Sequence, residues 1–114
     1  MIMIFLIDCS VGKKQVFYNE MFQPPVIKIS KSGLQITTEN SKKNSALLIY
    51  KIEATENFET SEIYLRGFQA LGKEYKNKFQ INLDNSVVEN IGNYKIFWLD
   101  PDNIKHELKM KNAP

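Results

Sequence analysis

The sequence has little of the chemistry on which most enzymes depend. Among its 114 residues are one cysteine, Cys9, and one histidine, His106. A single cysteine cannot form an intrachain disulfide, and no cysteine or histidine pair stands at the spacing of a zinc site. Glycine-rich phosphate loops and serine elbows are also absent from the sequence. We therefore expect a protein that is not an enzyme and that requires no cofactor.

Neither charge nor apolar runs indicate a nucleic acid or a membrane as the partner. The chain has 15 basic and 13 acidic residues, a net charge of +2, which is too small to predict nucleic-acid binding. The lysine clusters at 13–14, 42–43 and 73–78 fall where turns are expected and are typical of solvated loops. No apolar run approaches the ~20 residues that a membrane-spanning helix needs.

The first ten residues, MIMIFLIDCS, allow two interpretations. The continuous apolar run 2–7 is typical of a buried β-strand. Alternatively, residues 1–10 are the remnant of an export signal, with Cys9 as a lipid anchor. Against the export signal, no basic residue precedes the run and Asp8 stands where a small residue is expected. We favour the strand. Asp8 and Ser10 bring no group that would favour a reactive thiolate at Cys9.

Alternating apolar and polar residues recur along most of the chain, which is typical of β-strands. The expected strands are 2–7, 26–30, 34–38, 45–55, 61–71, 75–83 and two closing runs, 94–99 and 104–110. Pro24-Pro25 marks a sheet edge or crossing, because proline has no N–H for a central ladder. The one helical candidate, 86–91, is a single turn. We expect one all-β domain over residues 1–114, a two-sheet sandwich or barrel of seven to nine strands.

The closing hairpin has a register that the turn chemistry selects. Pro101, Asp102 and Asn103 suit a three-residue loop, with Asn103 in the left-handed position that ends it. This loop pairs Trp98 with His106, Ile96 with Leu108 and Tyr94 with Met110. Trp98 and His106 then face the interior, together with Ile104 two residues earlier.

Residues 75–110 resemble an immunoglobulin-like domain of the disulfide-free, tyrosine-corner type. The resemblance is carried by Phe79-Gln80-Ile81, by Val87-Val88 and by Asn90-Ile91-Gly92-Asn93-Tyr94, with Gly92 as the sharp lead into the strand. It implies a two-sheet Greek-key sandwich in which the hydroxyl of Tyr94 bonds back to upstream backbone. The chain departs from the family pattern where Asn90 replaces Asp and Ile96 replaces the second Cys, and it has no Trp in the central strand.

Two groups of polar residues invite a functional interpretation. His106 could act as a metal ligand, pH switch or general base, but no partner residue is tied to it, and we favour a hydrogen-bonded interior histidine. Residues 100–103, Asp-Pro-Asp-Asn, offer oxygen ligands for calcium. The calcium-loop pattern fails at Ile104 and lacks its glycine, so we favour a hairpin turn. No metal site is predicted.

A surface remains as the best candidate site. Five residues are expected to face outward from two neighbouring strands: Tyr64, Arg66, Phe68, Phe97 and Leu99. Aromatic residues and arginine are enriched at interaction hot spots. In strand 45–55, Leu47 and Ile49 would also face outward if Leu48, Tyr50 and Ile52 face inward. Two alternatives stay open: strand 2–7 covers this surface, or the two faces are exchanged.

These observations predict a non-catalytic binding module that recognises a protein partner, or a second copy of itself, through an exposed sheet face. A carbohydrate-binding module is one alternative, with Tyr64, Phe68 or Trp98 stacking on sugar rings. A structural domain of a cell-envelope lipoprotein is another, and it depends on lipidation of Cys9. The compartment stays open, with a preference for the extracellular space or the cell envelope.

Overall fold

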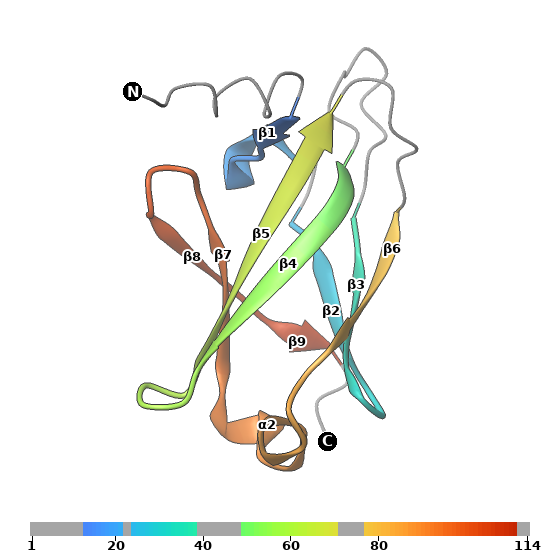
Figure 1. Cartoon of the computed structure of the whole chain (residues 1–114), viewed down its shortest axis with the longest axis vertical. Helices are drawn as coiled ribbons and strands as arrows, with labels where there is room; N and C mark the ends of the chain where they lie inside the picture. Colours follow the sequence, from blue (N-terminus) through green and yellow to red (C-terminus); the bar gives the residue numbers. More distant parts are fainter. Residues whose placement is uncertain (1–12, 22–23, 39–48, 71–76, 112–114) are drawn as a thin grey trace, which may run out of the picture.

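The computed structural model describes residues 13–21, 24–38, 49–70 and 77–111 (Figure 1). The elements in chain order are β1 (Lys13–Gln15), the 3-10 helix η1 (Tyr18–Glu20), β2 (Val26–Ser30), β3 (Gly33–Thr37), β4 (Ile49–Asn57), β5 (Glu62–Ala70), β6 (Lys78–Asn82), α2 (Asn85–Glu89), the 3-10 helix η2 (Ile91–Asn93), β7 (Lys95–Leu99), β8 (Lys105–Leu108) and β9 (Met110–Lys111). The all-β, two-sheet prediction is confirmed. The predicted strand 2–7, Cys9, Leu47 and Leu48 lie outside the described residues.

Strand β5 is the centre of the first sheet. It pairs with β4 along one edge, and along the other edge with β7 at its start and β1 at its end. The β5–β7 pairing is parallel, and β7 pairs antiparallel with β8. Strand β8 is therefore one of the outer strands of this sheet.

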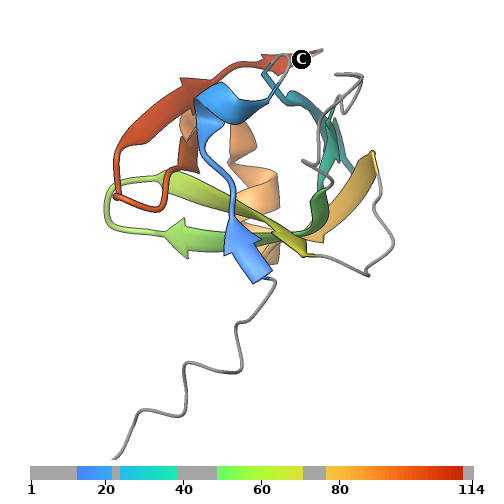
Figure 2. The same cartoon turned by 90° about the horizontal axis from the view of Figure 1, so that it is seen from above.

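The second sheet has the order β6-β3-β2-β9 (Figure 1). The chain runs from β8 in the first sheet to β9 in the second with only Lys109 between them. Seen from above, the two sheets curve around a common interior (Figure 2). In the described part of the chain, no helix is long and apolar enough to span a membrane. The two parallel ladders, β5–β7 and β2–β9, are established, whereas immunoglobulin-like connectivity stays a prediction.

The closing hairpin has the predicted loop and register. Asn103 adopts a left-handed conformation with φ 69°, and the N–H of Asp100 donates to the carbonyl of Ile104 at 3.0 Å. Trp98 pairs with His106, and Ile96 pairs with Leu108. The turn chemistry of Pro101-Asp102-Asn103 therefore sets which residues of β7 face the interior.

Trp98 is the largest fully buried side chain, at 0% exposure. Its indole N–H donates to the carbonyl of Val16 at 3.0 Å. The ring lies against the backbone of Gly67, where an added Cβ would stand only 2.4 Å from the indole Cη2. Gly67 follows Ile63 and Leu65 on the inward face of β5, and both of those are also fully buried. A bare backbone at position 67 thus provides the space for the indole.

Three predicted orientations or pairings are wrong. Ile49 is fully buried rather than outward, because a bulge between Ile49 and Lys51 shifts the register of β4, so that Ile49 and Ile52 are both buried. Tyr94 does not pair with Met110, because the chain changes sheets at Lys109 and Met110 pairs with Ile27. Ile104 is 54% exposed, because it closes the turn rather than continuing the strand.

The lead into β7 also differs from a tyrosine corner in its details. Gly92 is exposed, and an added Cβ would meet no atom within 4 Å, so the backbone does not require glycine there. The N–H of Tyr94 closes η2 by bonding to Ile91. Among the described residues, no hydrogen-bond partner is found for the Tyr94 hydroxyl. The Tyr94 side chain instead packs, partly buried, against the core.

Candidate interaction surface

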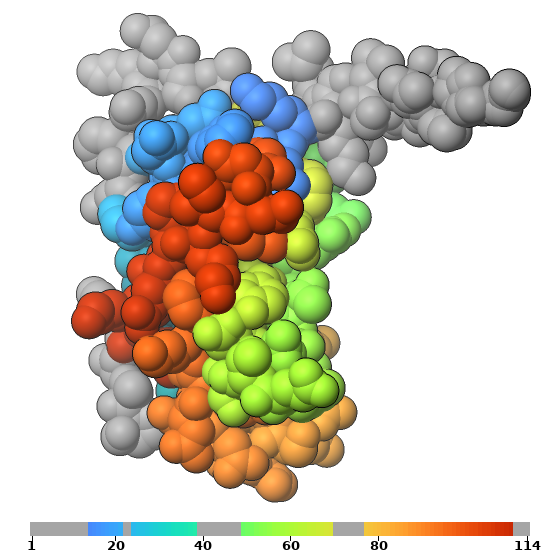
Figure 3. All heavy atoms as spheres, turned by 90° about the vertical axis from the view of Figure 1, so that its left-hand side faces the viewer, coloured from blue at the N-terminus to red at the C-terminus, as the bar shows by residue number. Residues whose placement is uncertain are grey.

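The outward face of the first sheet brings the predicted surface residues together. On β5, Tyr64, Arg66 and Phe68 alternate with inward residues, and all three are partly exposed. Tyr64 lies directly beside Phe97 of β7 in the parallel ladder. Figure 3 shows the two hairpins, β4–β5 and β7–β8, lying on one side of the molecule. We call the set Tyr64, Arg66, Phe68 and Phe97 the aromatic face.

A lysine covers the centre of the aromatic face. The rings of Tyr64 and Phe97 are 6.1 Å apart between centroids and inclined by 40°. The Nζ of Lys105 lies 4.9 Å from the Phe97 centroid and 5.5 Å from the Tyr64 centroid. Cations at these distances from aromatic faces are attracted by the ring quadrupole. Lys105 therefore adds a positive charge to an otherwise apolar centre.

Glu62 holds this lysine in place. The Lys105 Nζ lies 3.3 Å from a Glu62 carboxylate oxygen, and the Tyr64 hydroxyl donates a hydrogen bond to the same oxygen. The Tyr64 hydrogen bond, followed by the interactions with Lys105, lowers the pKa of Glu62 below its usual value. Glu62, Tyr64 and Lys105 thus form one hydrogen-bonded group that fixes the orientation of the phenol ring.

Polar and charged residues of strand β4 border the aromatic face beside Arg66 and Phe68. The Arg66 guanidinium donates to the Thr55 hydroxyl at 3.3 Å. The Lys51 Nζ lies 6.0 Å from the Phe68 centroid and 2.8 Å from a Glu53 carboxylate oxygen. Hydrogen bonding to Glu53 raises the pKa of Lys51. Charged groups therefore border the rings, the arrangement typical of a protein-binding surface.

Leu99 contributes less to this surface than predicted. It has the outward position after Phe97, yet it is only 7% exposed and does not belong to the core cluster. Its carbonyl accepts a hydrogen bond at 3.0 Å from the Gln15 side chain. Leu99 therefore presents little area to a partner.

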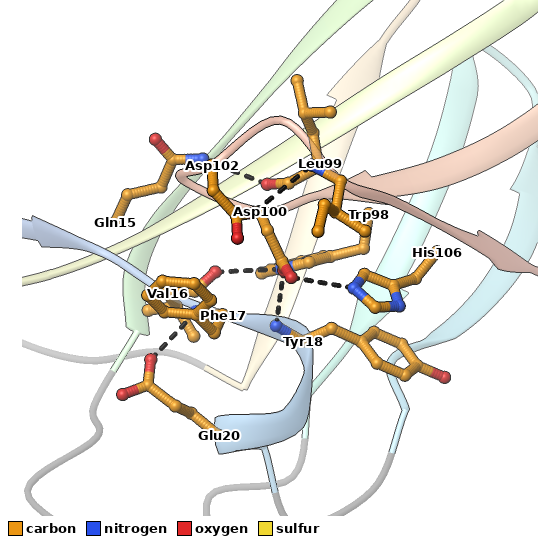
Figure 4. Close-up of polar contacts among 11 residues, drawn as sticks. Gln15, Val16, Phe17, Tyr18, Glu20, Trp98, Leu99, Asp100, Asp102 and His106 are labelled. Atoms are coloured by element: carbon orange, nitrogen blue, oxygen red, sulfur yellow. Dashed lines mark hydrogen bonds and ion pairs between the residues drawn. The ribbon is translucent and has the colours of Figure 1, made fainter.

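Asp100 and His106 form a second polar group, beside the 3-10 helix η1 (Figure 4). The buried Asp100 carboxylate accepts the Tyr18 N–H at 2.8 Å and lies 2.8 Å from the His106 Nε2. The His106 ring stacks on the Tyr18 ring, with centroids 4.5 Å apart and planes inclined by 7°. These contacts fit the hydrogen-bonded histidine that we favoured from the sequence, but the His106 side chain is 32% exposed and therefore lies at the border of the interior rather than inside it.

The turn 100–103 uses its carboxylates internally. Asp100 binds Tyr18 and His106, while the Asp102 carboxylate accepts the Ile104 N–H at 3.3 Å. Within the described residues, no three histidine, cysteine or carboxylate side chains are grouped to hold a metal ion. The described contacts of residues 100–103 are those of a hairpin turn.

Comparison with known protein families, curated proteins and solved structures finds no match. Glu62 was not predicted from the sequence, and Asp100 was considered there only as a calcium ligand. Glu62 shares the outward face of Tyr64 by its spacing of two and could have been found in that way. The role of Asp100 could not, because Tyr18 stands 82 residues away from it.

Proposed function

We propose that the chain is a non-catalytic binding module that recognises a protein partner through the aromatic face of its first sheet. The observation that carries this proposal is the contact of Tyr64 and Phe97 beneath the Lys105 ammonium. Partly exposed rings bordered by charge offer apolar contact area together with charge-based selectivity. An immunoglobulin-like Greek-key arrangement is part of the same proposal.

The carbohydrate-binding alternative has weaker support. Trp98, the best stacking residue of the three considered, is 0% exposed and cannot contact a sugar. The Tyr64 and Phe97 rings are inclined by 40° and do not form a flat platform. The lipoprotein alternative depends on Cys9, which lies outside the described residues, and no described contact favours it.

The test compares two phenylalanine-to-serine variants in affinity capture with quantitative mass spectrometry. Phe97→Ser removes a ring from the aromatic face, whereas Phe58→Ser removes the 58%-exposed ring at the β4–β5 hairpin tip and serves as the matched control. We expect Phe97→Ser to lose a partner that wild type and Phe58→Ser both retain. Both variants should melt within a few degrees of wild type, since a partly exposed residue contributes modestly to the core.

Sedimentation velocity applies the same comparison to self-association. A dimer seen for wild type and Phe58→Ser but not for Phe97→Ser would identify a second copy as the partner. The proposal is refuted if wild type, Phe97→Ser and Phe58→Ser capture the same partners and form dimers to the same extent. Unfolding of Phe97→Ser would also refute it, because it would show that Phe97 belongs to the core.

A further inference from the structure

A slot opens between the two sheets where β8 leads into β9. Strands β2 and β9 pair in parallel at Ile27 with Met110 and at Lys28 with Lys111. Upstream of Val26 the chain continues as Pro24-Pro25, and proline has no N–H to donate to a neighbouring strand. The ladder therefore cannot extend along β8. The resulting cavity has a volume of about 310 Å³ and is lined by Tyr18, Pro24, Pro25, Val26, Glu107, Leu108 and Lys109.

The edge of β8 beside this slot carries backbone groups that pair with no described strand. The hydrogen bond from Asp100 to Ile104 fixes the alternation of the β7–β8 ladder, so that His106 and Leu108 bond to β7. The N–H and C=O of Lys105 and Glu107 then point to the opposite edge. These groups make no backbone hydrogen bond to another residue in the described ranges. Exposed edges of this kind are templates for an added strand.

The wall of the slot formed by Tyr18 is held in place. The Tyr18 ring stacks on His106, and its N–H bonds to the buried Asp100 carboxylate. In Figure 3 the blue segment that contains η1 lies directly against the red β8 segment. A ligand entering here would meet a preformed apolar wall, which lowers the entropic cost of binding.

We propose that the β8 edge binds an extended peptide as an added strand, with aliphatic side chains in the slot and charged side chains on the outer face. Peptide N–H and C=O groups would bond to the backbone of Glu107 and Lys105. Aliphatic side chains would lie beside Leu108 against Tyr18 and the two prolines. On the outer face, Lys105, Glu107 and Lys109 present the charge order plus, minus, plus, so the complementary peptide carries acidic, basic and acidic residues at alternate positions. This site lies at the outer edge of β8 and goes beyond the aromatic face, with which it shares Lys105, whose ammonium also lies over Phe97 and Tyr64.

The probe is the acetylated and amidated heptapeptide Val-Glu-Leu-Lys-Leu-Glu-Val, added to the isotopically labelled full chain. We expect saturable shifts of the Glu107 and Lys109 amide resonances and slower hydrogen exchange at the Lys105 and Glu107 amides. The charge-reversed heptapeptide, Val-Lys-Leu-Glu-Leu-Lys-Val, should bind about fivefold more weakly, the equivalent of ~1 kcal/mol for a surface ion pair. A probe that is N-methylated along one edge should not bind, because it lacks the main-chain donors.

Two variants locate the site. Glu107→Pro removes an N–H that faces the slot and leaves the β7–β8 ladder bonds in place, so it should abolish binding. Lys109→Glu should weaken the first probe and strengthen the charge-reversed probe, a gain that a folding defect cannot produce. Phe68→Ser should leave probe binding unchanged, because Phe68 belongs to the aromatic face but stands beside Gln15 of β1 and Lys51 of β4 rather than beside β8.

Four outcomes would overturn the proposal. One is the absence of saturable shifts at millimolar probe, and another is equal binding of the N-methylated probe. The third is a Lys109→Glu variant that binds the two heptapeptides with the same preference as wild type. The last is a dimer of the unliganded protein that Glu107→Pro dissolves, which would assign the edge to a second copy of the chain.

Discussion

Replacing Gly67 by alanine tests whether the indole of Trp98 packs directly on β5. The new Cβ would stand 2.4 Å from the indole Cη2 and 2.7 Å from Cζ2, too close for any ordinary contact. The indole cannot withdraw freely, because it is fully buried and its N–H bonds to Val16. Overpacking of a core typically costs 1–3 kcal/mol, and a lost hydrogen bond adds ~1 kcal/mol. We expect Gly67→Ala to lower the free energy of unfolding by about 2–4 kcal/mol.

Urea unfolding followed by tryptophan fluorescence measures this loss, and Trp98 is the single tryptophan of the chain, so the signal comes from the site itself. For a domain of this size the loss corresponds to a melting temperature lower by about 8–16 °C. The matched control is Gly92→Ala. An added Cβ at position 92 meets nothing within 4 Å, so this variant should match wild type or be more stable by up to ~1 kcal/mol.

Equal stability of Gly67→Ala and Gly92→Ala would show that the indole does not pack directly on the backbone of β5. A double variant sharpens the test. The smaller ring of Trp98→Phe should relieve the clash, so Gly67→Ala should cost less in that background than in wild type, by at least ~0.5 kcal/mol. Additive losses would show that the glycine and the indole do not touch.

Three further predictions concern polar side chains. Asp100→Ala should lower the free energy of unfolding by ~2–3 kcal/mol in a urea titration, because it leaves the Tyr18 N–H and the His106 ring without their acceptor; a loss below ~0.5 kcal/mol would contradict the role of this carboxylate. The lowered pKa of Glu62 means that its ionised form adds stability above the ordinary value of 4.5, and that this stability is lost as the pH falls through the lower folded-state pKa. Glu62→Gln should therefore lose less stability than wild type on acidification below pH 4.5, and an unchanged acid profile would refute the linkage. Tyr94→Phe should change stability by less than ~0.5 kcal/mol, since no described group bonds to its hydroxyl; a loss above 1 kcal/mol would restore the tyrosine corner.

Local chemistry explains what the sequence predicted well. The conformations required by Pro101, Asp102 and Asn103 fix the hairpin register, which in turn places Trp98 inward and Phe97 outward. The alternation along β5 likewise places Tyr64 outward. Such features depend on a few consecutive residues, and a single sequence carries that information.

Features that depend on distant residues were not predicted. Nothing near Ile49 announces the bulge that turns it inward, because a bulge reflects how the partner strand fits. The change of sheet at Lys109, which separates Met110 from Tyr94, arises from the pairing of β9 with β2. From the sequence, Gly67 is an ordinary strand glycine, because the residue that packs on it, Trp98, stands 31 positions later.

Val16 and Tyr18 bond to residues that are synthesised much later, and this separation affects when the protein interior can be completed. Their hydrogen bonds lead to Trp98 and Asp100, each 82 positions later in the chain. While the ribosome is still making β7, the inward residues of β5 have no indole to cover them. The interior is therefore complete only once β7 has been made, and until then Ile63 and Leu65 lack part of the packing that buries them.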